Sequence, residues 1–191
     1  KIPSSSFGLA FDASLHLGTL AAVLIFFFKD YLKVLSFKNK LFFKLLVGTI
    51  PAVIFGLLFE QQIEGSVRQL WVIGVALVVF SAVMYLADKL GKKIKTADQV
   101  NFVQSLLIGL AQALALIPGV SRSGATISAG LFAGFKREDA ARFAFMLSGP
   151  IIAGAGSKQF LSVIISSRIS GQDLQFFLIG MASSFIFGYF T

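Results

Sequence analysis

One arginine stands out among the residues that could do chemistry, because it lies alone in a long uncharged stretch. Arg122 is part of the turn Pro-Gly-Val-Ser-Arg-Ser-Gly at residues 118–124, and no Asp or Glu occurs between Asp98 and Glu138. A charge placed well inside a bilayer costs at least about 3 kcal/mol and usually faces the protein interior or water. Arg122 therefore needs an anionic partner from elsewhere, and the guanidinium fork is well matched to phosphate oxygens.

The neighbours of Arg122 are residue types that suit an anion. Gly119 and Gly124 permit tight backbone geometry and close approach of a ligand. Ser121, Ser123 and Thr126 offer hydroxyl donors. A helix that begins near Ser123 would direct its N-terminal amides and its positive dipole end to the same place. The turn therefore predicts an anion site. The alternative is a plain interfacial turn whose arginine reaches out to lipid head groups.

The remaining candidates for chemistry are fewer. Asp12 and His16 are four residues apart and would share a helical face, which suits either a proton-handling pair or a polar boundary at the start of a span. The chain has no cysteine and one histidine, which excludes disulfides, thiolate metal sites and His-rich metal sites. Any metal would be a hard cation bound through oxygen and phosphate.

The composition places these residues in a membrane protein. Of the 191 residues, 56% are hydrophobic and 14% are charged, against roughly 25% charged in a soluble domain. The mean hydropathy is +0.84. The net charge of +8 comes from basic residues in short connectors, as the positive-inside rule expects, and not from a stripe interleaved with aromatics. We therefore expect membrane lipids as partners and no nucleic acid.

The apolar runs predict an all-α integral membrane protein, a polytopic helical bundle. The candidate spans outside the Arg122 region are residues 7–28, 41–59, 69–87, 143–165 and 174–191. Each approaches the ~20 residues that a helix needs to cross a bilayer. The lysine-rich connectors 29–44 and 88–98 are separated by two spans, so they lie on the same side, which the positive-inside rule makes cytoplasmic.

Residues 102–135, which contain Arg122, predict a hairpin instead of a crossing. The return run 125–135 is too short to cross ~30 Å as a helix, and the basic pair Lys136-Arg137 follows it. If that pair is cytoplasmic, the segment enters and leaves by the same face as a re-entrant helix–turn–helix hairpin. Broken helices at membrane depth are tolerated only inside protein or along a wet cavity. We expect this hairpin to be half of an inverted-repeat architecture.

Both ends of the chain predict a truncated protein. The chain begins at Lys1 with no cleavable signal pattern and stops at Thr191 within an apolar run. We expect residues 1–191 to be a single transmembrane domain that forms a fragment of a longer protein.

The segment 109–126, which reads Gly-Leu-Ala-Gln-Ala-Leu-Ala-Leu-Ile-Pro-Gly-Val-Ser-Arg-Ser-Gly-Ala-Thr, closely resembles the bacterial undecaprenyl-diphosphate phosphatase family of the bacitracin-resistance type. The similarity continues through residues 127–135 and 140–156. Shorter family-like segments lie at residues 11–19 and 49–52. The resemblance thus spans most of the chain, and its Pro-Gly-x-Ser-Arg-Ser-Gly motif is highly specific.

The resemblance implies an enzyme of the bacterial plasma (inner) membrane that hydrolyses undecaprenyl diphosphate to undecaprenyl phosphate plus inorganic phosphate. This reaction recycles the lipid carrier for cell-wall synthesis and confers bacitracin resistance. The family architecture is two re-entrant hairpins in an inverted repeat, with a site open to the outer face. A polyprenyl diphosphate lipid is then the substrate, and a divalent cation, Mg or Ca, is the cofactor.

The resemblance also assigns roles to residues of the turn. Arg122 becomes the diphosphate clamp, and Ser121 and Ser123 become its catalytic neighbours. The expected phosphate-binding set is completed by Gly119, Gly124 and Thr126.

One family motif is absent. A glutamate-rich helix leading into Leu-Pro-x-Ser-Ser-Thr-Gly-His has no counterpart here, and Pro3–Ser6 echo it without the glutamates or the Thr-Gly-His. We expect the motif upstream of Lys1, with the metal ligands, the nucleophile and the acid–base groups. The fragment alone would then hold no metal and be inactive. The residues of the turn include no acid–base pair, so a transporter or flippase of a phosphorylated polyprenyl lipid stays open as an alternative, as does a non-catalytic scaffold. The sequence does not give the oligomeric state.

Overall fold

The predicted helical membrane architecture is present in the computed structural model, which describes residues 4–35, 40–59, 69–166 and 171–190. Every regular element in these ranges is a helix, with one isolated bridge between Lys95 and Phe135. Helices long and apolar enough to cross a membrane are α3 (Lys40–Leu58), α5 (Leu70–Leu90) and residues Asp173–Phe190 of α9 (Gly171–Phe190). The protein is therefore an all-α, multi-pass membrane protein.

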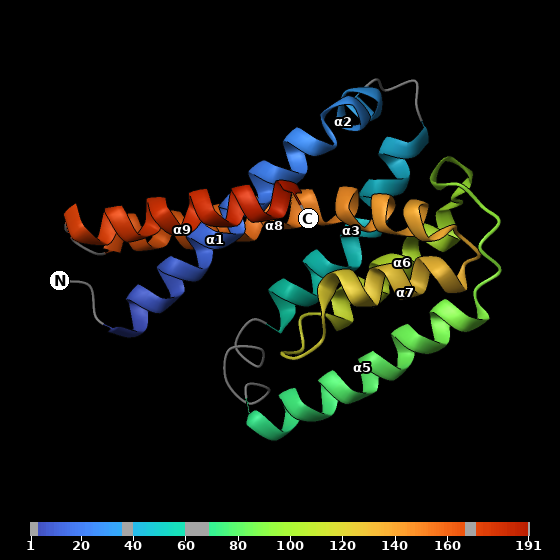
Figure 1. The fold of residues 1–191 in the computed structure, drawn as a ribbon, viewed down its shortest axis with the longest axis horizontal. Coiled ribbons are helices and arrows are strands. Elements are labelled where there is room, and N and C mark those ends of the chain that lie inside the picture. Colours follow the sequence, from blue (N-terminus) through green and yellow to red (C-terminus); the bar gives the residue numbers. More distant parts are fainter. Residues whose placement is uncertain (1–3, 36–39, 60–68, 167–170, 191) are drawn as a thin grey trace. The chain divides into compact units, whose positions relative to one another are not determined.

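The helices form two compact units, one made of residues 1–32 with 149–191 and the other of residues 33–148. The first unit is held by small residues between α1 (Ser4–Phe26) and α9, which lie side by side (Figure 1). Thr19 Oγ1 lies 2.8 Å from Ser184 Oγ, and Ser184 donates to the carbonyl of Leu15 at 2.8 Å. A side chain added at Gly18 would meet the backbone of Met181. Small and hydroxyl-bearing residues let the two backbones approach closely, as membrane helices require.

The helix in the first predicted span, residues 7–28, ends before the apolar run does. Helix α1 stops at Phe26, and the chain bends by 75° before α2 (Phe28–Leu35). No Pro or Gly marks this bend. It falls where the uniformly apolar run gives way to Lys29, Asp30 and Lys33, so that α2 has a polar face that most of α1 lacks.

The second unit is organised by a close crossing of α3 and α6 (Phe102–Leu114). A Cβ built on Gly109 would lie 2.8 Å from Gly48 Cα and closer still to the Gly48 carbonyl oxygen, so the two backbones touch at these glycines. Ser105 donates its hydroxyl to the Lys44 carbonyl beside them. Helix α3 contains Pro51 and continues beyond it to Leu58.

Helices α6 and α7 (Arg122–Phe132) form the predicted hairpin, and α5 packs along α7 (Figure 1). The open end of the hairpin is tied together, because Gln104 Nε2 donates to the Ala133 carbonyl at 3.2 Å. The connector before α6 also lies against the one after α7, with Lys136 N donating to the Lys95 carbonyl at 2.9 Å. Both ends of the hairpin therefore meet at the same place. That the hairpin re-enters a membrane stays a prediction.

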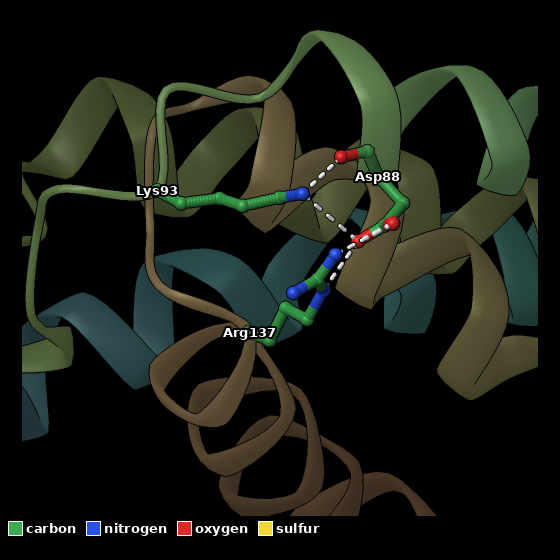
Figure 2. Close-up of polar contacts among 3 residues, drawn as sticks. All are labelled: Asp88, Lys93 and Arg137. Atoms are coloured by element: carbon green, nitrogen blue, oxygen red, sulfur yellow. Dashed lines mark hydrogen bonds and ion pairs between the residues drawn. The ribbon is translucent and has the colours of Figure 1, made fainter.

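An ion-pair cluster fixes α5 to the start of α8 (Arg137–Ser166) at this same place (Figure 2). The Asp88 carboxylate accepts from Arg137 Nε at 2.6 Å and Nη2 at 2.9 Å, and Lys93 Nζ lies 3.2 Å from it. The Asp88 carboxylate raises the pKa of Arg137 through these hydrogen bonds. Nearby, Asp139 Oδ1 accepts from Ala97 N in the short helix η1 (Ala97–Gln99) at 2.8 Å.

Candidate functional site

The site begins where α6 breaks after Leu114. Three tight turns follow, in which the amides of residues 115, 116 and 117 donate to carbonyls three residues earlier, each at 3.1 Å. Pro118 has no N–H with which to continue a helix. Gly119 then adopts a φ of +94°, the left-handed region that favours glycine. The Pro-Gly pair therefore both ends α6 and reverses the chain.

The turn is packed against α5, which fixes its position. Ala76 of α5 forms a buried cluster with Val120 and Ala125, and Phe80 and Ile117 pack on its edge. A Cβ on Gly119 would lie 2.6 Å from the Ile73 carbonyl oxygen. No larger side chain fits at residue 119, so the backbone of the turn lies directly on α5.

The start of α7 presents donors on its exposed side. Ser121 is the N-cap, and its Oγ accepts from Gly124 N at 3.1 Å while lying 3.4 Å from Ser123 Oγ. Among the residues that the structure describes, the N–H groups of Arg122 and Ser123 have no hydrogen-bond acceptor. Two exposed hydroxyls and two unpaired amides at a helix N-terminus together suit an anion.

Arg122 is the first residue of α7 and is half-buried. In the part of the chain that the structure describes, no ion pair or hydrogen bond of its guanidinium is found. A partly buried charge without a counter-charge is costly. That Arg122 binds an anion from outside its own hairpin stays a prediction.

Five of the six predicted site residues lie together at the turn and the start of α7, and the sixth, Thr126, is buried beneath them. Ser121, Arg122 and Ser123 share the first turn of α7 with Gly124, and Gly119 lies in the adjoining reversal. We call residues 119–124 the cradle. Thr126 is buried, and its hydroxyl bonds the carbonyls of Arg122 at 2.8 Å and Ser123 at 3.1 Å. Thr126 therefore stabilises the backbone of the cradle from the buried side of α7. The phosphate contact assigned to each of these residues stays a prediction.

Two further polar residues of the hairpin were not singled out from the sequence. Gln112 on α6 and Ser128 on α7 are each 2% exposed, and the side-chain oxygen and nitrogen of Gln112 and the hydroxyl of Ser128 have no hydrogen-bond partner in the described part of the chain. Buried polar groups are seldom left unpaired. The signal was present for Gln112, an amide in the middle of an apolar helical run.

The other sequence candidates form no second site. His16 Nδ1 lies 2.7 Å from the backbone carbonyl of Asp12, and both residues are exposed, so this contact belongs to the helix backbone. Among the described residues no three His, Asp or Glu side chains gather as metal ligands. The divalent cation that the resemblance implies stays a prediction.

Comparison with known proteins agrees with the motif in the cradle. Residues 2–191 match the family described as bacitracin resistance protein BacA. A protein from Rubrobacter xylanophilus, named undecaprenyl-diphosphatase, is 40% identical over 96% of this chain and 72% of its own length. Undecaprenyl-diphosphatase 1 from Pseudoalteromonas translucida is 42% identical over 95% of this chain and 72% of its own length. The undecaprenyl-diphosphatase of Caldicellulosiruptor bescii is 44% identical over 88% and 68%.

Proposed function

Because this chain belongs to the family of bacitracin resistance protein BacA, we propose that it acts in the hydrolysis of undecaprenyl diphosphate to undecaprenyl phosphate and inorganic phosphate. The observation that carries the proposal is Arg122, a half-buried cation without a counter-charge in the described residues, placed beside two hydroxyls and two unpaired amides. The three relatives above, all named for this phosphatase activity, support the same substrate class.

The cradle would act by holding the diphosphate while charge moves across it. In the net reaction the bridging P–O bond breaks, its electron pair leaves with undecaprenyl phosphate, and the hydroxyl of a water molecule ends on the released inorganic phosphate while its other proton passes to solvent. The transferring group spreads negative charge over its outer oxygens. The fork of Arg122, the hydroxyls of Ser121 and Ser123 and the N-terminal amides of α7 can donate to those oxygens without rearranging. The described residues supply this electrostatic part of the reaction, and we assign them no general base.

Glycines permit the close approach that this binding needs. Gly119 lets the chain reverse while its backbone lies on α5, and Gly124 leaves the capping hydroxyl of Ser121 uncovered, since a Cβ there would come within 3.1 Å of it. A phosphate can therefore reach backbone amides that side chains would otherwise shield.

The membrane setting is also part of the proposal. We place the hairpin of α6 and α7 as a re-entrant segment that starts from the cytoplasmic side of the bacterial inner membrane, with its cradle opening toward the outer face. The tied ends of the hairpin support entry and exit at one face. A divalent cation, Mg or Ca, would bind through phosphate oxygens and ligands outside the described residues. The product would return to cell-wall synthesis as lipid carrier, which is the basis for bacitracin resistance.

The test is phosphate release from undecaprenyl diphosphate by the full-length protein in detergent. We expect release by the wild type and at least a hundredfold slower release by Arg122→Ala, in the range seen when one transition-state donor is removed. Lys40→Ala, which removes a positive charge from an exposed position at the start of α3, is the matched control and should turn over normally. Tight binding without phosphate release in the wild type would instead indicate a transporter, and unchanged release in Arg122→Ala would overturn the role of the cradle.

A further inference from the structure

An apolar groove lies between α5 and α7 and has a volume of about 420 Å³. Its walls are formed by Ser81, Met84 and Tyr85 of α5 and by Ile127 and Leu131 of α7. The Asp88–Arg137 ion pair lines its far end. We call this feature the α5–α7 groove.

The groove lies close to the cradle. Met84 forms part of its wall, and the Met84 sulfur lies 3.8 Å from where a Cβ on Gly124 would be. Gly124 belongs to the first turn of α7 and donates its N–H to the Ser121 cap. Ile127 and Leu131 follow about one and two turns further along α7. The groove therefore begins about one turn of α7 beyond the anion-binding donors, and its two α7 residues, Ile127 and Leu131, span about 6 Å of helix at 1.5 Å per residue.

Its chemistry fits a hydrocarbon chain attached to a phosphate. The walls offer a thioether, an aromatic ring and two branched aliphatic side chains, with Ser81 as the only small residue among these five. Met84 and Tyr85 are 47% and 59% exposed, so the groove is open along its side and a long chain can leave it laterally into lipid. The hydrocarbon tail of a diphosphate bound in the cradle must point away from the donors. The groove offers an apolar path that begins near them.

The far end of the groove argues against a phospholipid with its head group at that end. Both cations there, Arg137 and Lys93, are already paired with the Asp88 carboxylate, so neither offers a vacant charge to a phosphate. The donors without partners lie at the opposite end, in the cradle. A ligand with one anionic head and one apolar tail is thus oriented head to cradle and tail along α7.

We propose that the α5–α7 groove is the tail subsite of this protein and holds the first isoprene units of a polyprenyl diphosphate bound in the cradle. The inference rests on the proposed function for its ligand. Since lipid is as apolar as the groove, the groove contributes shape and orientation and little hydrophobic driving force. It aligns the diphosphate with Arg122 and selects substrates that carry a tail.

The experiment fills the groove and compares ligands with and without a tail. Ser81→Trp places a large ring in the groove, and Ser81→Leu is a smaller wedge at the same position. Val79→Trp is the matched control, because Val79 is also an exposed residue of α5 but points about 160° away from Ser81 around the helix. The ligands are farnesyl diphosphate and methyl diphosphate, and both the Kd and phosphate release are measured on the full-length protein.

We expect Ser81→Trp to raise the Kd and KM for farnesyl diphosphate by on the order of tenfold, the lower range for lost apolar pocket contacts. Ser81→Leu should have a smaller effect in the same direction. Methyl diphosphate should bind and react equally well in all variants, and Val79→Trp should match the wild type with both ligands.

Two results would overturn the tail subsite. One is an equal response of the two ligands to Ser81→Trp, including no response at all. The other is that Ser81→Trp loses a phospholipid that co-purifies with the wild type, while its Kd for farnesyl diphosphate is unchanged. That result would show that the groove binds membrane lipid and not the substrate tail. Failure of the proposed function looks different, because then neither ligand releases phosphate in any variant while the Kd values still report on the groove.

Discussion

The close crossing of α3 and α6 gives a sharp prediction for Gly109→Ala. The added methyl group would lie 2.8 Å from Gly48 Cα, whereas carbon atoms pack best at about 3.5–4.0 Å. The atoms that it meets are backbone atoms, which cannot rotate away. The two helices must therefore separate by roughly 1 Å, with the arm of the hairpin that leads into the cradle shifting away from α3.

The magnitude follows from opposing terms. Overpacking a close contact costs about 1–3 kcal/mol, and separation of the helices strains the hydrogen bond from Ser105 to Lys44, worth about 1 kcal/mol. Alanine in place of glycine in a helix returns about 1 kcal/mol. The last two terms cancel, so the net destabilisation is about 1–3 kcal/mol. At about 2–4 °C per kcal/mol, this corresponds to a Tm lower by roughly 2–12 °C.

The assay is thermal unfolding of the full-length protein in detergent, followed by the loss of helical circular dichroism. Gly74→Ala is the matched control, since a Cβ at this exposed position on α5 meets nothing within 4 Å. It should leave the Tm unchanged or raise it slightly through helix propensity. If Gly109→Ala unfolded at the same temperature as Gly74→Ala or above it, the glycine crossing of α3 and α6 would be refuted.

Three further predictions concern the hairpin and its surroundings. Gly119→Ala should lower stability by about 1–3 kcal/mol and weaken binding of diphosphate ligands, because residue 119 has a φ of +94° and lies against the Ile73 carbonyl; full binding by a stable variant would contradict the packing of the turn. Gln112→Leu should raise the Tm, since it removes a buried amide that has no hydrogen-bond partner among the described residues and whose desolvation then costs about 1–3 kcal/mol. A lower Tm would show that the amide is hydrogen-bonded in the protein. Asp88→Asn should release Arg137 and Lys93 and lower the Tm at low salt, with the difference shrinking in 1 M salt because the cluster is exposed to solvent.

The local architecture of the hairpin could be predicted because consecutive residues of the chain determine it. Pro118 and Gly119 dictate the break, and the short return run before Lys136 dictates that the second arm is brief. The isolation of Arg122 was likewise visible, since charges are rare in apolar sequence and their spacing needs no fold to be read. These features depend on backbone chemistry or on neighbours within a few positions.

The features that the sequence did not reveal depend on residues far apart in the chain. The contact of Gly48 with Gly109 and the ion pair of Asp88 with Arg137 join separate helices, and no local pattern specifies either partner. The groove arises only once Met84 and Ile127 face each other. The bend after Phe26 has no Pro or Gly to mark it. The sequence was sufficient to predict where helices form, and the structure was needed to establish which helices pair.

The central claim is that Arg122 and its neighbouring donors grip a diphosphate. The most direct measurement is the Kd of the full-length protein for a polyprenyl diphosphate analogue whose bridging oxygen is replaced by a methylene group, so that binding is separated from cleavage. We predict weaker binding by Arg122→Lys, which keeps the charge but loses the two-pronged fork, and still weaker binding by Arg122→Ala. Wild-type affinity in both variants would contradict the account.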